Sequence, residues 1–137
     1  MTIRTPDDQL SLHVATFNQV SEGVLWADKQ GRIAHANEAS ARLLGYTMPQ
    51  LLRSSYLEID PNYSLLGWKK FWRQLSSEGS THLDTQFVNV EGIFFGVRGH
   101  ITFDELAGDR ELCLIVFSST EEGRREAELG KRALRVR

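Results

Sequence analysis

The sequence predicts a single α+β domain built around one five-stranded antiparallel sheet, with short helices packed on one face. Two observations lead to this fold class. Residues 23–45 read as two short apolar strands followed by a short helix, and residues 81–118 read as three strands separated by polar turns. A hairpin and a three-stranded meander can join into one sheet, and the helices between them then cover one of its faces.

Length and composition are those of one soluble globular domain. The chain has 137 residues, of which 41% are hydrophobic and 25% charged, with a formal net charge of −2. So small a charge does not favour nucleic acid or a membrane surface. The longest apolar run, residues 112–117, is far shorter than the roughly 20 residues of a membrane span. The N-terminus lacks the layout of a secretory signal, so we expect a cytoplasmic location without direct nucleic-acid binding or membrane insertion.

The N-terminal tail, residues 1–20, predicts an amphipathic lead-in helix. Leu10, Val14 and Phe17 recur at helical spacing. Asp7 and Asp8 precede them, and negative charge suits the N-terminus of a helix because of the helix dipole. The tail therefore has one apolar stripe that can pack against another surface.

A β-hairpin and a short helix are expected next. The hairpin strands are residues 23–28 and 31–36, and Gly31 provides the backbone freedom that a tight turn needs. Asn37 is a good helix N-cap, because its side chain can accept a hydrogen bond from a free amide of the first turn. Gly45 then suits the helix C-terminus.

A brief helix at residues 48–52 and a loop precede a longer helix. Pro49 suits the first turn of the brief helix, where the amide N–H is not needed. We expect the longer helix to open at Asp60 and to end at Gly79. Its apolar residues recur every three or four positions and form the largest aromatic cluster of the sequence: Leu65, Trp68, Phe71, Trp72 and Leu75.

Three antiparallel strands are expected at residues 81–90, 93–103 and 110–118. Strand alternation places one set of residues of the second strand toward the helices: Ile93, Phe95, Val97, Ile101 and Phe103. The opposite face carries Phe94, Arg98 and His100, and we expect the last two to meet the lead-in helix or a second subunit. After these strands, residues 119–137 are charged and helix-prone, and Gly123 and Gly130 interrupt them. We therefore divide the chain into the tail (1–20), the domain (21–118) and a C-terminal linker helix (119–137).

The order of elements and several motifs resemble the PAS, or sensory box, family of bacterial multidomain signalling proteins. The motifs are Asp28-x-x-Gly31-Arg32-Ile33, Asn37-Glu38-Ala39 and Leu44-Gly45-Tyr46-Thr47. The resemblance runs from about Val20 to Thr120. Further along, Ile59-Asp60-Pro61, Trp68, Trp72, Leu75 and Gly79-Ser80 resemble the middle helix of a subgroup found in sensor kinases, cyclases and transcription activators.

The resemblance implies a sensory or dimerising module rather than an enzyme. In this family the lead-in helix often packs against a second copy, which implies a homodimer through Leu10, Val14 and Phe17. The last strand runs into a linker, which implies a signal relay through Ser118, Ser119 and Thr120 to a C-terminal output domain. The output domain would be, for example, a histidine kinase, cyclase or transcription activator, on the same full-length chain or on a partner protein. The helices and inner sheet face enclose a pocket, whose candidate lining here is Trp68, Phe71, Trp72, Phe87, Phe95, Val97 and Leu114.

Two departures from the family pattern bear on this expectation. Many relatives end the last strand with Asp-Ile-Thr, but this chain has Ser118-Ser119-Thr120, so the charge at the first position, on which a salt-bridge relay would depend, is absent. The hairpin at residues 87–92 lacks the basic residues that are common there. Its apolar surface is read either as core or as a partner face.

The sequence argues against two cofactors known in this family and leaves non-covalent flavin open, although no residue specifically supports it. Cysteinyl-flavin chemistry needs a cysteine just after the short helix, where this chain has Arg53-Ser54-Ser55-Tyr56, and haem sensors commonly supply a histidine from the middle helix, where residues 61–80 contain none. The four histidines, His13, His35, His82 and His100, lack a spacing suited to a metal, so we predict neither metal nor cofactor.

Candidate catalytic groups are equally scarce. Cys113 lies in an apolar strand and is read as a small buried hydrophobe. Glu58 and Asp60 could form a carboxylate pair with Tyr56 as an acid, but we expect solvated loop carboxylates and a capping role for Asp60. Without a convergent acid, base or nucleophile, no catalytic residue is predicted.

Two functions remain open at this point. In the first, the aromatic residues line a pocket for an unidentified small organic ligand, whose binding is relayed to the output domain. In the second, they fill the interior, and the ligand-free module serves only in homodimerisation or partner docking.

Overall fold

The computed structural model describes residues 22–104 and 111–120, together with residues 123, 125 and 129. The predicted lead-in helix, with Leu10, Val14 and Phe17, lies outside the described residues. So does most of the predicted linker helix.

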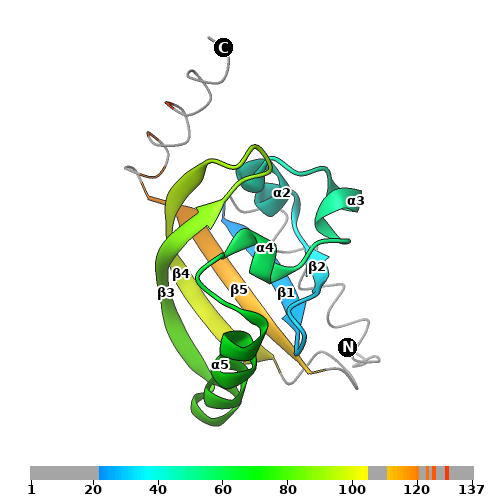
Figure 1. Ribbon diagram of the computed structural model, residues 1–137, viewed down its shortest axis with the longest axis vertical. Coiled ribbons are helices and arrows are strands. Elements are labelled where there is room, and N and C mark those ends of the chain that lie inside the picture. The colour runs from blue at the N-terminus through cyan, green and yellow to red at the C-terminus, as the bar shows by residue number, and fades with distance from the viewer. Residues whose placement is uncertain (1–21, 105–110, 121–122, 124, 126–128, 130–137) are drawn as a thin grey trace, which may run out of the picture.

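The described residues form one five-stranded antiparallel sheet with four helices over one face (Figure 1). The spatial order of the strands is β2-β1-β5-β4-β3, so the first hairpin and the C-terminal meander join through the pairing of β1 with β5. The predicted fold class is confirmed. The strands are β1 (Gly23–Asp28), β2 (Ile33–Ala36), β3 (Ser80–Val88), β4 (Phe94–Asp104) and β5 (Leu112–Ser119). The helices are α2 (Glu38–Leu44), α3 (Met48–Leu51), α4 (Tyr56–Ile59) and α5 (Leu65–Glu78).

The turn of the first hairpin is held by the side chain of Asp28. Its Oδ1 accepts hydrogen bonds from the backbone N–H groups of Gln30 and Arg32, both at 2.9 Å. Its Oδ2 forms an ion pair with Nε of Arg32 at 3.0 Å. Gly31 has a φ of 87°, which a glycine adopts without steric cost. The predicted turn is therefore formed by the hydrogen bonds and ion pair of Asp28 together with the left-handed backbone of Gly31.

Both ends of α2 are as predicted. The Oδ1 of the buried Asn37 accepts from the backbone N–H of Ser40, which caps the helix, and from that of Val24, which ties the helix to β1; both distances are 2.9 Å. Gly45 ends the helix in the left-handed conformation. One asparagine thus fixes where the hairpin passes into the helices.

The predicted start of the longer helix is wrong. The N-cap of α5 is Ser64, whose Oγ accepts from the backbone N–H of Gly67 at 3.0 Å. Residues expected as loop form α4 instead, capped by Ser55, and Asp60 lies at the C-terminal end of that helix. Pro61 explains why α4 ends at Asp60, because a proline disfavours helical backbone in the residue before it, and Asp60 has φ −117° and ψ 89°.

The main core lies between the sheet and the helices. In β4, Phe95, Val97 and Ile101 are buried there and Phe94 is half exposed, so the predicted alternation is confirmed. In β5 the buried inner-face residues are Cys113, Ile115 and Phe117.

A smaller apolar cluster occupies the opposite face of the sheet. Val24, Trp26 and Leu112 are buried in it, and Leu114 and Val116 pack against them. Leu114 therefore does not line the space beneath the helices, and its prediction as a pocket residue is wrong. The reason is the strand period of two, which places Leu114 on the opposite face from Cys113 and Ile115.

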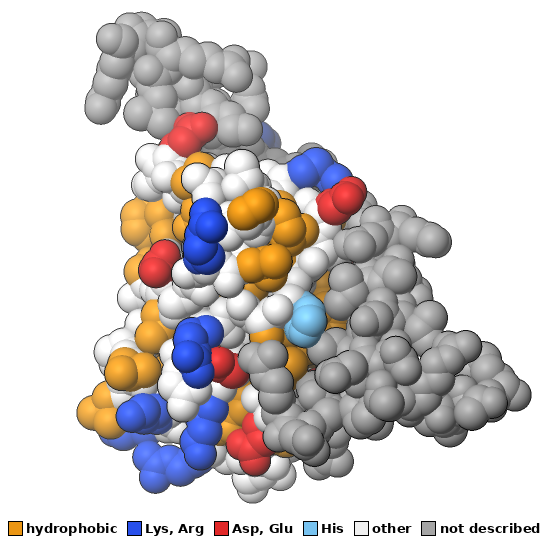
Figure 2. All heavy atoms as spheres, turned by 90° about the vertical axis from the view of Figure 1, so that its right-hand side faces the viewer, with side chains coloured by type: hydrophobic (Ala, Val, Ile, Leu, Met, Phe, Trp, Pro, Cys, Tyr) orange, Lys and Arg blue, Asp and Glu red, His pale blue; other side chains and the backbone are white. Residues whose placement is uncertain are grey.

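The surface carries charges of both signs. Figure 2 shows one face on which hydrophobic side chains are interspersed with Lys and Arg and with Asp and Glu. No helix in the described part of the chain is long and apolar enough to cross a membrane.

Candidate functional site

The interior is filled by aromatic side chains from helices and strands. Tyr56, Trp68 and Phe87 are fully buried, and the ring of Tyr56 lies 5.0 Å from that of Trp68 and 5.7 Å from that of Phe87. Phe117 continues the cluster at 5.0 Å from Phe87. The predicted pocket residues Trp68, Trp72, Phe87, Phe95 and Val97 all belong to this core, where they contact other protein side chains.

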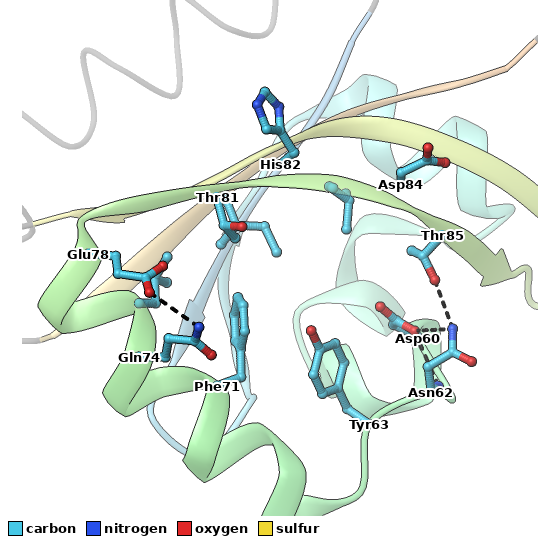
Figure 3. A pocket seen from close by; sticks show the side chains of 13 residues that line it. Asp60, Asn62, Tyr63, Phe71, Gln74, Glu78, Thr81, His82, Asp84 and Thr85 are labelled. Atoms are coloured by element: carbon cyan, nitrogen blue, oxygen red, sulfur yellow. Dashed lines mark hydrogen bonds between the residues drawn. The ribbon is translucent and has the colours of Figure 1, made fainter.

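An open cleft of about 370 Å³ lies beside this core, between α5 and β3 (Figure 3). Phe71 is the one residue of the predicted pocket lining that borders it. Most of the others were missed because they are polar or lie on the edge strand β3: Asp60, Asn62, Tyr63, Gln74, Glu78, Thr81, His82, Leu83, Asp84 and Thr85. Leu75 of α5 and Ile101 of β4 also border the cleft, and the sequence assigned both to the apolar face of their element. Figure 3 shows Phe71 and Tyr63 directed toward the open space, whereas His82 and Asp84 project to the other side of β3.

A buried carboxylate forms one end of the cleft. Asp60 is 1% exposed, so the expectation that it is solvated is wrong. Its Oδ2 accepts a hydrogen bond from the hydroxyl of Tyr56 at 3.0 Å, and its Oδ1 accepts from the backbone N–H and the side-chain Nδ2 of Asn62 at 3.2 and 3.0 Å. The Asn62 Nδ2 also donates to Oγ1 of Thr85 at 2.8 Å, which links the loop before α5 to β3.

Burial shifts the pKa of both partners in the bond between Tyr56 and Asp60. Loss of water raises the pKa of Asp60, although the hydrogen bonds from Tyr56 and Asn62 oppose the shift. The pKa of Tyr56 is raised well above its usual value by burial and by the negative charge of Asp60. Tyr56 therefore remains a hydrogen-bond donor at neutral pH. Glu58 is exposed, so the two carboxylates do not share one environment.

Cys113 is fully buried on the inner face of the sheet, as predicted. Burial raises the pKa of its thiol to about 12. Since the thiolate is the nucleophile and the redox-active form, this side chain is chemically inert while it stays buried.

The predicted relay residues lie where β5 leaves the sheet. Ser118 and Ser119 pair with Arg98 and Val97 of β4. The backbone N–H of Thr120 donates to the carbonyl of Gly96 at 3.0 Å. The Oγ1 of Thr120 accepts from the backbone N–H of Gly123 at 2.8 Å, which is the geometry of a helix N-cap. We call Gly96, Thr120 and Gly123 the exit junction.

Close backbone packing holds the exit junction together. Gly123 is helical and buried, and a Cβ placed on it would lie 2.3 Å from the carbonyl oxygen of Gly96. A Cβ on Gly96 would lie 3.0 Å from Oγ1 of Thr120. The absence of a side chain at Gly123 therefore allows the helical residue to lie directly against β4. The sequence showed Gly123 only as an interruption in a helix-prone segment.

The open antiparallel sheet with helices on one face, the aromatic core and the capped segment after the last strand are the features of a sensory-domain fold. A family model described as PAS domain matches residues 12–79. The chain belongs to the PAS family.

Solved structures of PAS domains have the same fold. A PAS domain of an HTR-like protein from Haloarcula marismortui is 18% identical with a TM-score of 0.71, over 82% of this chain and 98% of that chain. A PAS domain of a two-component sensor histidine kinase is 18% identical with a TM-score of 0.67, over 82% and 96%. The PAS domain of nitrogen regulation protein NR(II) from Vibrio parahaemolyticus is 18% identical with a TM-score of 0.62, over 80% and 98%. The search of curated proteins found no match. PAS domains of this fold occur in a two-component sensor histidine kinase and in nitrogen regulation protein NR(II).

Proposed function

We propose that this PAS domain is a non-catalytic cytoplasmic module that relays a conformational change through the exit junction to an output domain located C-terminally on the same chain. The observation that carries the proposal is the pair of bonds made by Thr120, which joins the carbonyl of Gly96 in β4 to the N–H of the helical Gly123. One residue thus contacts both the sheet and the segment that leaves it.

The place of β5 in the sheet supports this route. It pairs with β1 along residues 112–117 and with β4 along residues 112–119, so a shift in either neighbour changes the path of β5. A relay of this kind needs an element with two arrangements whose balance the input changes. Among the described residues, the Thr120 cap, the bonds of Thr120 to Gly96 and the contact of Gly96 with Gly123 are few enough to be exchanged for water.

A test uses a chimera in which residues 1–137 precede a histidine kinase core. Thr120→Val removes the hydroxyl that accepts from Gly123 and keeps the shape of the side chain. We expect the autokinase activity of the chimera to change at least about fivefold, the ratio that corresponds to one hydrogen bond of about 1 kcal/mol. Thr120→Ser keeps the hydroxyl and is the matched control. Equal activity of wild type, Thr120→Val and Thr120→Ser would contradict the relay.

The filled core favours a second function, in which the domain binds no small molecule and acts in homodimerisation or partner docking. Large buried rings occupy the space beneath the helices where a ligand would lie: Trp68, Tyr56, Phe87, Phe95 and Phe117. Native mass spectrometry of the purified protein separates the two functions. A small molecule bound at about one per chain favours a ligand sensor, and an apoprotein dimer favours the pairing module.

A further inference from the structure

We propose that His82 and His100 form a binding site for a divalent transition-metal ion of the Zn²⁺, Ni²⁺ or Cu²⁺ type on the outer face of the sheet. The two residues lie directly opposite each other in the antiparallel pair of β3 and β4. Their ring centroids are 4.8 Å apart, and the ring planes are inclined by 50°. Both residues are exposed, and neither takes part in the relay proposed above.

The separation of the two rings suits a shared metal ion. A zinc–imidazole bond is about 2.0–2.1 Å long, which places the centre of each ring about 3.2 Å from the metal. Two such rings at bond angles of about 90° to 110° have centroids roughly 4.5–5.2 Å apart. The observed 4.8 Å lies within this range, so the two rings are spaced as two ligands of one ion would be.

Both imidazoles are available for a ligand. Within the described part of the chain, neither ring takes part in a hydrogen bond or an ion pair. This differs from His35, which lies edge-on against Trp26 at 6.3 Å and has a further interaction of its own. Imidazole nitrogen is a ligand that zinc, copper and nickel prefer, and it binds them in its neutral form.

The surroundings leave room for the remaining ligands. His82 and His100 border a shallow hollow of about 530 Å³, together with Glu22, Asp84, Arg98 and Ser118. The charge of Arg98 is partly offset by Asp84, whose Oδ1 lies 3.9 Å from the Arg98 Nε. Water can occupy the other coordination positions of an ion at this hollow. A metal held there would fasten the edge strand β3 to β4.

The prediction that the chain holds no metal rested on the spacing of histidines along the sequence. His82 and His100 are separated by a whole hairpin, so their spacing resembles none of the familiar metal motifs. Strand pairing alone brings them together. No group of three or more potential ligand side chains occurs among the described residues, so we expect a two-histidine site completed by water.

Calorimetric titration of the tag-free protein with ZnCl₂ and with NiCl₂ tests the proposal. We expect one metal ion per chain. We expect His82→Gln and His100→Gln each to weaken metal binding by more than about tenfold, because loss of a group that only hydrogen-bonds to a ligand already weakens binding by about that factor, and a direct ligand contributes at least as much. His35→Gln is the matched control and keeps wild-type affinity. Acidification releases the metal, because protons compete for the same nitrogens.

Two results would overturn the proposal. One is the absence of binding by the wild-type protein at millimolar metal. The other is equal affinity of wild type, His82→Gln and His100→Gln, which would place the metal elsewhere. Thermal unfolding without metal checks that the variants are folded. We expect their melting temperatures to equal that of the wild type, because both histidine side chains are exposed.

Discussion

Asp60 shows how a single buried group can hold several segments together. Its carboxylate accepts from Tyr56 and Asn62, and Asn62 in turn contacts Thr85 of β3. We predict that Asp60→Ala lowers the free energy of unfolding by about 1–3 kcal/mol, because the buried hydroxyl of Tyr56 loses its partner. Asp60→Asn is the control, since its amide can still bond to both neighbours, and it loses less. Urea unfolding of the three proteins measures this; equal losses would contradict the account.

The raised pKa of Asp60 makes part of the stability depend on pH. The folded state holds the proton of Asp60 more tightly than the unfolded state does. The protonated carboxyl therefore contributes its full stability when the pH lies below the pKa of an ordinary aspartate, and this stability is lost as the pH rises through the raised pKa of the folded state. We predict that the free energy of unfolding of wild type falls relative to that of Asp60→Asn as the pH rises across this window. A difference that grows in the opposite direction would show that hydrogen bonds outweigh burial at this carboxylate.

At the scale of elements, the start of α5 gives a direct test. Ser64 caps the helix through its bond to Gly67. We predict that Ser64→Ala lowers the free energy of unfolding by about 0.5–2 kcal/mol, the usual effect of losing an N-cap. Ser64→Asp keeps a capping oxygen and is the control, which we expect to stay close to wild type in thermal or urea unfolding. A Ser64→Ala protein as stable as wild type would argue that α5 begins elsewhere.

The elements that sequence reasoning located well are those with strong local signals. Asn37 acts through a side-chain oxygen that can cap a helix, and Gly45 acts through a left-handed backbone that few other residues adopt so readily, so both helix ends were predicted. The start of α5 was missed because Asp60 and Ser64 are both capable caps, and a proline after Asp60 also suits a first helical turn; in the structure Asp60 ends α4 instead, and its carboxylate accepts from Tyr56 and Asn62. Leu114 was misplaced because residues 112–117 are all apolar, so the pattern does not mark which residues face the helices.

The candidate sites depend on contacts between distant residues, and a sequence pattern does not contain these. His82 and His100 meet through strand pairing, and Gly96 and Gly123 meet at the exit junction. The aromatic residues were correctly assigned to one cluster, but whether they line a space or fill it depends on their packing. The class of protein was therefore within reach of the sequence, and the sites were not.

At the scale of the whole molecule, the account depends on coupling between the sheet and the helical segment after Thr120. Gly123→Ala tests it, because the added Cβ would lie 2.3 Å from the carbonyl oxygen of Gly96 and must displace one from the other. Amide hydrogen exchange of the 137-residue chain measures the result. We predict that the amides of Thr120 and Gly123 exchange at least about fivefold faster in the variant, as expected for a loss of about 1 kcal/mol, while those of β1 keep wild-type rates. Unchanged exchange at Thr120 and Gly123 would contradict the exit junction as the route of the signal.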